Sequence, residues 1–288
     1  MSKIEVKAWA KLNLSLDVAG KREDGYHELT MVMQTVSLCD DVSIELTPAG
    51  VSAFTSFRFI PNDERNLAVK AAEAFFAAAG ISSGARISIN KRIPVGSGMG
   101  GGSSDAAAVL RGLNELFGGR FTPRELEDIG ARVGSDVPFC VRGGTQLARG
   151  RGELLSPLPP LPDCHIVICK PDFSISTPEL YRKLDAVQIR CRPDTQGIIS
   201  ALGSGDLAGV ARRMYNVFES VPDRRRKSIA AIRSSLLDRG ALGSVMTGSG
   251  SAVFGIFAGE DAARAACSAV GKNHGFCCQA RNIPADRV

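Results

Sequence analysis

Three observations predict an α+β fold in two domains. Segments with the period of strands and segments with the period of helices are intermixed in both halves of the chain. The length of 288 residues is sufficient for a sizeable core and for two domains. Residues 157–162 contain four prolines and have the composition of a linker. We therefore expect an N-terminal domain over residues 1–155 and a C-terminal domain over residues 156–288.

The hydrophobic period identifies the first elements in chain order. Residues 4–18 alternate between apolar and polar side chains, which predicts a half-buried strand or two strands separated by a kink. A Glu-Asp-Gly turn follows at residues 23–25. Residues 66–79 have the apolar spacing of an amphipathic helix, which the glycine at position 80 ends. Residues 87–89 alternate again, as in a strand.

Two more helices are expected before the linker. One covers residues 104–117, where alanine and leucine recur at helical spacing. The other is capped by the Thr-Pro pair at residues 122–123, and Leu126 and Ile129 face inward from it.

The same signals recur beyond the linker. Residues 166–169 are a short apolar run, which predicts a buried strand. Residues 177–178, a Thr-Pro pair, open a helix. Residues 253–257 predict a further strand after the small-residue turn at residues 247–250. The second domain is therefore also mixed.

The charge of the chain does not indicate a nucleic-acid partner. The formal net charge is only +5, and the one dense basic run, residues 224–227, is typical of a solvated helix face. One tryptophan and three tyrosines, with no basic–aromatic interleaving, disfavour nucleic-acid binding. A mild positive balance is compatible with an anionic small molecule.

Cysteine and histidine usage indicates a reducing compartment and no zinc site. The eight cysteines form no Cys-x-x-Cys, and the three histidines are far apart in the sequence. Residues 1–6 lack the apolar core of a signal peptide, and no apolar run is long enough to span a bilayer. We expect a cytoplasmic protein with reduced thiols and no membrane partner.

Residues 94–107 carry the strongest functional signal. Five of the seven residues from 96 to 102 are glycine, between a predicted strand and a predicted helix. Without a Cβ, consecutive N–H groups can turn toward one point, and an anion can approach them closely. Ser103 and Ser104 lie where the following helix is expected to be capped, and its dipole favours negative charge at that end. The segment therefore predicts a phosphate-binding loop.

Three other interpretations fit this loop less well. No lysine follows the last glycine, which excludes a Walker loop. The spacing Gly96-x-Gly98-x-x-Gly101 formally matches a dinucleotide fingerprint, with Glu115 as the ribose acid, but polar residues separate this run from the strand. A flexible linker is the third interpretation, and the alanine-rich helix directly after the loop makes it the poorer one.

Phosphoryl transfer also needs an oriented hydroxyl and a proton acceptor. Asp136, in Gly-Ser-Asp-Val-Pro-Phe, is the best candidate for the acceptor, although the residues alone fit a turn or helix cap equally well. Lys11 lies on the polar face of the first strand, where a lysine is usually only solvated. A nearby ammonium would keep Asp136 ionised and stabilise the transferring phosphoryl group.

Two sets of motifs resemble known families. The pattern Pro-x-Gly-x-Gly-x-Gly-Gly-Gly-Ser-Ser at residues 94–104 resembles the phosphate motif of the galactokinase, homoserine kinase, mevalonate kinase and phosphomevalonate kinase (GHMP) superfamily. Residues 25–29, 66–67, 176–181 and 247–250, in this order, resemble one branch of it, the 4-diphosphocytidyl-2-C-methyl-D-erythritol kinases. The similarity extends from about residue 6 to about residue 257.

The resemblance implies a fold, an activity and two cofactors. The fold would combine a ribosomal-S5-like N-terminal domain and a smaller ferredoxin-like C-terminal domain. The enzyme would use ATP, with Mg²⁺, to phosphorylate the 2-hydroxyl of 4-diphosphocytidyl-2-C-methyl-D-erythritol in the non-mevalonate isoprenoid pathway. The sequence identifies no metal ligand beyond the neighbouring Ser103 and Ser104. The partners would be these small molecules alone.

The resemblance also assigns roles to residues. It makes Asp136 the catalytic base and places Lys11 beside the reacting hydroxyl. Tyr26 and Tyr181 would sandwich the cytosine, and His27 would hydrogen-bond it. The expected ATP-binding residues are Asn66, Pro94, Gly96, Ser97, Gly98, Met99, Gly100, Gly101, Gly102, Ser103 and Ser104. The expected substrate-binding residues are Asn13, Tyr26, His27, Thr177, Tyr181, Thr247 and Gly248.

The chain departs from the pattern of this branch at two positions, and two other functions remain as alternatives. Ser97 occupies a position where glycine is common, and Tyr181 one where phenylalanine also occurs. A different sugar or alcohol kinase of the superfamily would keep the glycine loop but would have no use for an aromatic pair around a base. A non-enzymatic nucleotide-binding module would not need Lys11 together with Asp136.

Overall fold

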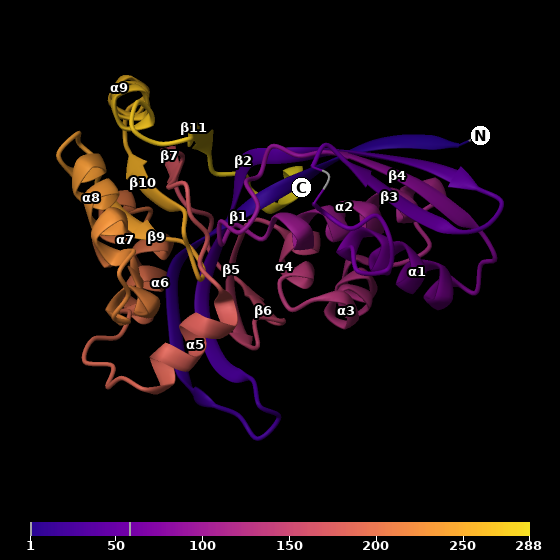
Figure 1. The fold of residues 1–288 in the computed structure, drawn as a ribbon, viewed down its shortest axis with the longest axis horizontal. Coiled ribbons are helices and arrows are strands. Elements are labelled where there is room, and N and C mark those ends of the chain that lie inside the picture. The colour runs from indigo at the N-terminus through magenta and orange to yellow at the C-terminus, as the bar shows by residue number, and fades with distance from the viewer. Residues whose placement is uncertain (1, 58) are drawn as a thin grey trace.

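The computed structural model describes residues 2–57 and 59–288, and it contains two sheets with helices packed against each (Figure 1). Among the described residues the first sheet has seven strands: β1 (Lys3–Lys21), β2 (His27–Thr47), β3 (Val51–Thr55), β4 (Gly84–Asn90), β5 (Thr145–Gly150), β6 (Leu154–Pro157) and β8 (Tyr215–Asn216). Their order is β3-β4-β2-β1-β8, and β5 pairs with both β2 and β6. The mixed α+β class is confirmed.

Four helices cover one face of the first sheet, below it in Figure 1: α1 (Leu67–Ala79), α2 (Gly101–Leu116), α3 (Pro123–Val133) and α4 (Val137–Arg142). The strand predicted over residues 4–18 is confirmed as β1, whose register against β2 shifts between Trp9 and Lys11. The expected half-buried pattern is wrong from Ala10 to Leu16, where the side chains of the polar face are buried as well. A Cβ at Gly112 of α2 would lie 2.6 Å from Cδ1 of Ile44, so this glycine lets the helix pack closely on the sheet.

The second sheet belongs to the C-terminal half. Its strands, in the order β11-β7-β10-β9, are β7 (His165–Lys170), β9 (Gly243–Met246), β10 (Val253–Phe257) and β11 (Phe276–Arg281). The helices of this half are α5 (Thr177–Asp185), α6 (Thr195–Gly203), α7 (Leu207–Arg213), α8 (Arg226–Leu237) and α9 (Glu260–Gly271), with the 3₁₀ turns η1 (Val217–Ser220) and η2 (Ala285–Arg287). The strands predicted at 166–169 and 253–257 are both confirmed.

Backbone hydrogen bonds are among the contacts that join the two halves. Strand β8, from the C-terminal half, pairs in parallel with β1, where Ser15 is opposite Tyr215. After β11 the chain returns to the first sheet, where the N–H of Ile283 donates to the carbonyl of Thr35 over 2.9 Å. A division at residue 155 stays a prediction.

Local capping signals explain where the helices begin and end. Thr122 and Glu125 form a reciprocal capping box at the start of α3, as the Thr-Pro pair predicts. Asn66 caps α1 by accepting a hydrogen bond from the N–H of Ala68, and Gly80 ends that helix in the left-handed conformation. These boundaries are therefore decided by residues that are neighbours in the sequence.

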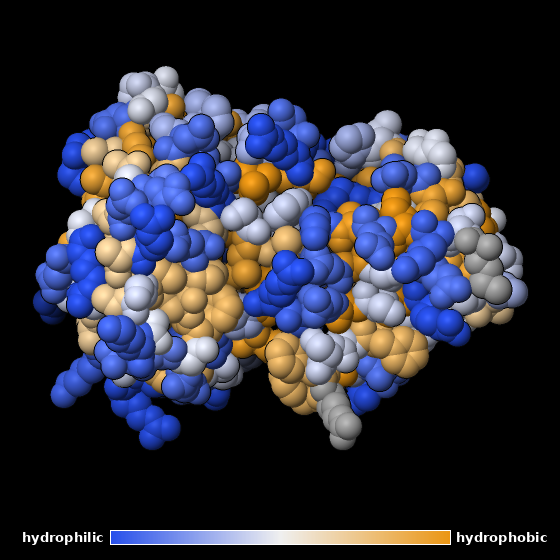
Figure 2. Space-filling model, turned by 90° about the horizontal axis from the view of Figure 1, so that it is seen from above, coloured by the Kyte–Doolittle hydropathy of each residue, from blue (hydrophilic) through white to orange (hydrophobic). Residues whose placement is uncertain are grey.

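Viewed from above, the molecule shows hydrophilic side chains interspersed with hydrophobic ones rather than one continuous apolar patch (Figure 2). Charged pairs cross the outer side of the first sheet, where Asp41 forms ion pairs with Lys7 and Arg92. Within residues 2–57 and 59–288, no helix has the length and apolar character required to cross a bilayer.

Candidate active site

A cavity of about 870 Å³ is lined by residues from both halves of the molecule. Most of the predicted site residues line it: Lys11, Tyr26, His27, Asn66, Pro94, Gly96, Ser97, Gly98, Gly100, Gly101, Gly102, Ser103, Asp136, Thr177, Tyr181 and Gly248. Four do not: Asn13, Met99, Ser104 and Thr247 are buried directly behind it. The fold thus gathers residues that span more than 200 positions of the sequence around one space.

The glycine loop borders this cavity and leads directly into α2. Gly100 has a φ of 71° and forms the N-cap of α2 in the left-handed conformation, which other residues rarely adopt. A Cβ at Gly98 would lie 2.2 Å from the carbonyl oxygen of Thr247, so the loop packs against the turn after β9. The first N–H groups of α2 have no partner within a helix and form an anion site together with the dipole.

The expected capping role of Ser103 and Ser104 is wrong. Helix α2 begins at Gly101, so both serines lie inside its first turn, and the N-cap is Gly100 without a side-chain hydrogen bond. The hydroxyl of Ser104 instead donates to the carbonyl of Gly100 over 3.1 Å, and Ser104 is buried. Ser103 is half-buried and lines the cavity. The helix starts earlier because glycine at position 100 can turn the chain there.

Lys11 and Asp136 meet at the edge of the cavity. Nζ of Lys11 lies 3.6 Å from Oδ2 of Asp136 and donates to Oδ1 of Asn13 over 2.8 Å. The Lys11 side chain is 5% exposed, whereas that of Asp136 is 31% exposed. Asp136 occupies the N-cap position of α4, but its side chain makes no capping hydrogen bond. The carboxylate is therefore not used as a cap and remains available to the cavity.

Asn13 and Thr247 hold this pair from behind. The hydroxyl of Thr247 accepts a hydrogen bond from the N–H of Asn13 over 3.1 Å, which ties β1 to the turn after β9. The amide of Asn13 lies 3.2 Å from the sulfur of Met31. The N–H of Lys11 donates to the carbonyl of Met99 over 3.1 Å, which ties β1 to the glycine loop. Strand, loop and turn are thus fixed to one another at Lys11.

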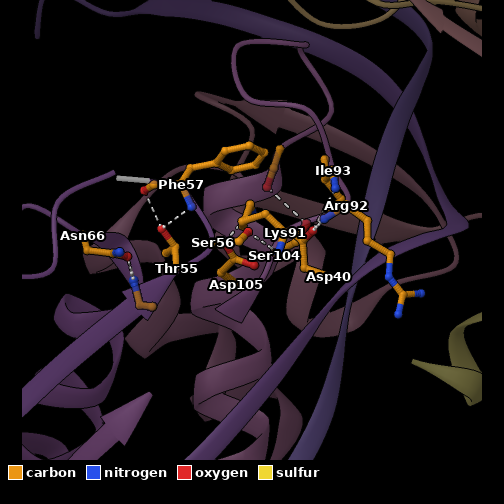
Figure 3. Close-up of polar contacts among 12 residues, drawn as sticks. Asp40, Thr55, Ser56, Phe57, Asn66, Lys91, Arg92, Ile93, Ser104 and Asp105 are labelled. Carbon is orange, nitrogen blue, oxygen red and sulfur yellow. Dashed lines mark hydrogen bonds and ion pairs between the residues drawn. The ribbon is translucent and has the colours of Figure 1, made fainter. Parts of the chain in front are cut away.

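A second lysine beside the loop was not predicted. Lys91, directly after β4, lies with its Nζ 2.5 Å from Oδ2 of Asp40 and 2.6 Å from Oδ2 of Asp105 (Figure 3). All three side chains are almost completely buried. Asp40 also accepts from the N–H of Ile93 over 2.8 Å. This cluster holds the chain that leads into the glycine loop. Figure 3 also shows the cap formed by Asn66 nearby.

Burial controls protonation in this cluster. Burial raises the pKa of Asp105 to about 8, although the neighbouring Lys91 opposes the shift. Burial lowers the pKa of Lys91, but the two carboxylates outweigh it, so that the pKa is raised overall. One oxygen of Asp105 has no hydrogen-bond partner, and Asp105 lines the cavity. The cluster therefore combines one lysine with two buried carboxyl groups, of which Asp105 has a raised pKa.

Aromatic side chains gather at another part of the cavity. The rings of His27 and Tyr181 are stacked with centroids 4.5 Å apart, and Phe218 meets Tyr181 edge-on at 5.0 Å. Tyr26 is 54% exposed, with the guanidinium of Arg151 4.9 Å from its ring centroid. Burial raises the pKa of the Tyr181 hydroxyl to about 12, with a smaller contribution from the charge of Asp136. Tyr26 and Tyr181 thus line one cavity.

Thr177 and Gly248 belong to a small-residue part of the lining. The hydroxyl of Thr177 lies 2.7 Å from that of Ser249, which joins the start of α5 to the turn after β9. A Cβ at Gly248 would lie 2.7 Å from the carbonyl oxygen of Gly98. The glycine loop, the start of α5 and the turn at residues 247–250 therefore form one wall of the cavity.

The lining offers few ligands for a metal ion on its own. Within residues 2–57 and 59–288 no group of three His, Cys, Asp or Glu side chains is placed to hold one. Ser104 is engaged with Gly100 and is buried, which does not fit a metal ligand. Ser103 and the unpartnered oxygen of Asp105 fit better, since Mg²⁺ prefers oxygen ligands and keeps most of its shell from water and phosphate.

Residues 66–144 match the GHMP kinases N terminal domain, and residues 198–275 match the GHMP kinases C terminal domain. A 4-diphosphocytidyl-2-C-methyl-D-erythritol kinase of Alkaliphilus metalliredigens is 45% identical over 267 residues, which cover 92% of each chain. The kinase of the same name from Acetivibrio thermocellus is 46% identical over 260 residues, or 90% of this chain and 92% of the relative.

Two solved structures have a similar fold. A crystal structure of 4-(cytidine 5'-diphospho)-2C-methyl-D-erythritol kinase has a TM-score of 0.80 and 35% identity, and covers 97% of this chain and 99% of that one. A homoserine kinase from Cytophaga hutchinsonii has a TM-score of 0.79 and 20% identity, and covers 99% and 95%. The second similarity concerns the fold alone.

Proposed function

The chain belongs to the 4-diphosphocytidyl-2-C-methyl-D-erythritol kinases within the GHMP kinases, and from this premise we propose how its residues perform the reaction. The enzyme transfers the terminal phosphoryl group of ATP to the 2-hydroxyl of 4-diphosphocytidyl-2-C-methyl-D-erythritol, in the non-mevalonate isoprenoid pathway. Its partners are therefore small molecules. The observation that carries the assignment of residues is the Lys11–Asp136 pair beside the glycine loop.

ATP would bind with its phosphates at the glycine loop. The N–H groups of Gly101 and Gly102 open α2 and lie at the positive end of its dipole. The other loop residues expected to contact the nucleotide shape this cradle: Pro94, Gly96, Ser97, Gly98, Met99, Gly100, Ser103 and Ser104. Asn66, which lines the same cavity and caps α1, would border the nucleoside. The loop needs no lysine of its own.

Asp136 would act as general base. Its carboxylate would accept the proton of the 2-hydroxyl as the hydroxyl oxygen attacks the terminal phosphorus, and ADP would leave with the electron pair of the broken P–O bond. Nζ of Lys11 lies 3.6 Å from this carboxylate and would attract it electrostatically. The ammonium also stabilises the negative charge of the transferring group, while Asn13 orients it.

Mg²⁺ typically accompanies ATP in kinases. When bound it would neutralise charge on the phosphate oxygens. Ser103 and Asp105 are the residues of this chain that would contribute oxygens to it. Asp105 would then lose the proton that burial favours, and Lys91 would compensate the remaining charge.

The cytidine would occupy the aromatic part of the cavity. Tyr26 and Tyr181 would border the base, and His27 would hydrogen-bond its edge. Thr177, Thr247 and Gly248 form the neighbouring wall, and they would enclose the diphosphate and methylerythritol part together with Asn13. The guanidinium of Arg151 already covers one face of the Tyr26 ring, so the base would stack on the other face.

The decisive assay measures ATP consumption with the cytidine-diphosphate methylerythritol compound beside mevalonate, homoserine and galactose. We expect turnover with the first compound alone. Turnover with one of the others at a comparable kcat/KM would contradict the assignment.

Replacing one ring tests the base site separately. Tyr26→Ala should lower the affinity for the cytidine substrate about ten- to a hundredfold, because base stacking contributes about 1–3 kcal/mol. ATP affinity should stay nearly unchanged. Since Tyr26 is more than half exposed, the fold should tolerate the change. An unchanged KM for the cytidine substrate would exclude Tyr26 from the site.

A further inference from the structure

We propose that Asp185 is a positioning residue for cytosine recognition, because it fixes the proton of the His27 imidazole on Nε2. The inference rests on the proposed function, in which the base lies beside His27. Asp185 was not among the residues predicted from the sequence. It does not line the cavity, and it would act on the substrate through His27 alone.

The contact joins two elements that are far apart in the sequence. Nε2 of His27, at the start of β2, lies 2.7 Å from Oδ1 of Asp185, at the end of α5. The His27 side chain is 10% exposed, so few other groups compete for its ring, whereas the Asp185 side chain is 43% exposed. An ionised carboxylate can only accept a hydrogen bond. Nε2 must therefore carry a proton.

The proton on Nε2 determines what the other ring nitrogen offers. A neutral imidazole has one N–H, so Nδ1 is left as an acceptor. Within the described residues no protein group hydrogen-bonds Nδ1, and His27 lines the cavity. The 4-amino group of cytosine is a donor and matches such an acceptor. Uracil carries an oxygen at this position, and two acceptors would face each other without a proton between them.

The same helix also fixes the plane of the ring. Tyr181 and Asp185 are four residues apart on α5, hence on one face of the helix. Tyr181 stacks on the imidazole at an interplanar angle of 28°. Phe218, which belongs to η1, packs edge-on against Tyr181. Stacking on Tyr181 restricts the tilt of the His27 ring. The carboxylate of Asp185 restricts the rotation of the same ring and selects its tautomer. Both restraints are needed for a defined acceptor direction.

The experiment compares CDP and UDP as competitors of the cytidine substrate in the full-length enzyme. In the unmodified enzyme we expect CDP to bind at least about tenfold more tightly than UDP, the ratio that one mismatched hydrogen bond produces. In Asp185→Asn the amide can also donate to Nε2, which allows the proton to move to Nδ1. The UDP-to-CDP ratio of inhibition constants should then fall about tenfold, mainly because UDP binds more tightly.

A matched control is Asp238→Asn. Asp238 is exposed at the end of α8, and within the described chain its side chain makes no ion pair or hydrogen bond. This variant should keep the ratio of the unmodified enzyme. A ratio that stays unchanged in a folded Asp185→Asn variant overturns the inference while leaving the base site intact.

A second measurement does not depend on nucleotide binding. The sequence has only three histidines, so ¹⁵N NMR of the ligand-free protein can resolve the ring nitrogens of His27. We expect the proton on Nε2 in the unmodified protein and a mixture of tautomers in Asp185→Asn. A proton on Nδ1 in the unmodified protein overturns the inference. If CDP fails to compete at all, the proposed base site is wrong, and the NMR result still decides the role of Asp185.

Discussion

Two lysines beside the glycine loop lie in very different surroundings. A Cβ at Gly100 would lie 3.1 Å from Cγ of Lys11, and a Cβ at Gly101 would lie 3.3 Å from Nζ of Lys91. Lys11 faces one carboxylate, 3.6 Å away and a third exposed. Lys91 is held by two buried carboxylates at 2.5 and 2.6 Å.

This difference agrees with the roles that we propose, a reactive one for Lys11 with Asp136 and a structural one for Lys91. A carboxylate that is loosely paired and open to the cavity can exchange its partner for a substrate hydroxyl. A lysine that contacts two buried carboxyl groups cannot leave them without a large cost, because these buried polar groups would lose their partner. The exposure of the acidic partner, more than the distance from the loop, therefore distinguishes the expected roles of Lys11 and Lys91.

Asp136→Asn should have the largest effect on the reactive side. Loss of the general base is expected to lower kcat by roughly two to four orders of magnitude. ATP affinity and thermal stability should change little, because Asp136 does not cap α4 with its side chain. Steady-state kinetics and calorimetric titration with ATP measure these quantities. Near-normal turnover of the folded variant would remove the base assignment.

Lys91→Met should have the largest effect on the structural side. Removing the cation leaves Asp40 and Asp105 buried together, and breaking a buried pair in this way costs about 3–5 kcal/mol. Denaturant unfolding measures the loss. The matched variant Lys11→Met should lose less stability, since its partner Asp136 is a third exposed and can be solvated. Equal losses in the two variants would contradict the distinction.

Gly100→Val affects the loop between the two lysines. A β-branched residue at a φ of 71° is strained, and its methyl groups would meet Lys11 and the place of the phosphates. ATP affinity should fall more than about a hundredfold, the ratio for a loss of about 2.7 kcal/mol. Gly118→Val is a control with similar strain, since Gly118 has a φ of 75° in open space. It should destabilise the fold without weakening ATP binding.

Asp105→Asn should have the smallest effect of these variants on the free energy of unfolding. Burial raises the pKa of Asp105 to about 8 from a usual value near 3.8, so between these limits the folded state binds a proton that the unfolded state has released. The contribution of Asp105 to stability is therefore fully present below about pH 4 and is lost as the pH rises toward 8. The neutral amide should remove this part of the pH dependence, measured by unfolding between pH 5 and 8. An unchanged slope would mean that Asp105 is ionised throughout.

The local parts of the fold could be predicted because their causes are local. The strand β1, the capping box of α3 and the turn before β2 depend on residues that are close in the chain. The start of α2 was misplaced by three residues, because the sequence does not show that Gly100 turns the chain before the serines. The roles of the site residues, the division at residue 155, the cytoplasmic location and the absence of a nucleic-acid partner stay predictions.

The Lys91 cluster was missed because its members are 51 and 14 residues apart and are joined only when β2, β4 and α2 pack together. One signal was present in the sequence. Asp105 shares a helical face with Ala108, Val109 and Gly112, and a charge on such a buried face requires a partner. The sequence cannot show which cation supplies it.

The sequence by itself determined the family, the glycine loop and most of the residues that line the cavity, since each follows from short motifs whose residues act as neighbours. Only the tertiary structure decided which lysine lies between two buried carboxyl groups, which aspartate has a raised pKa and which carboxylate contacts His27. These properties depend on burial and on partners brought in by other elements, because the dielectric surroundings of a charge and its hydrogen bonds are set by packing.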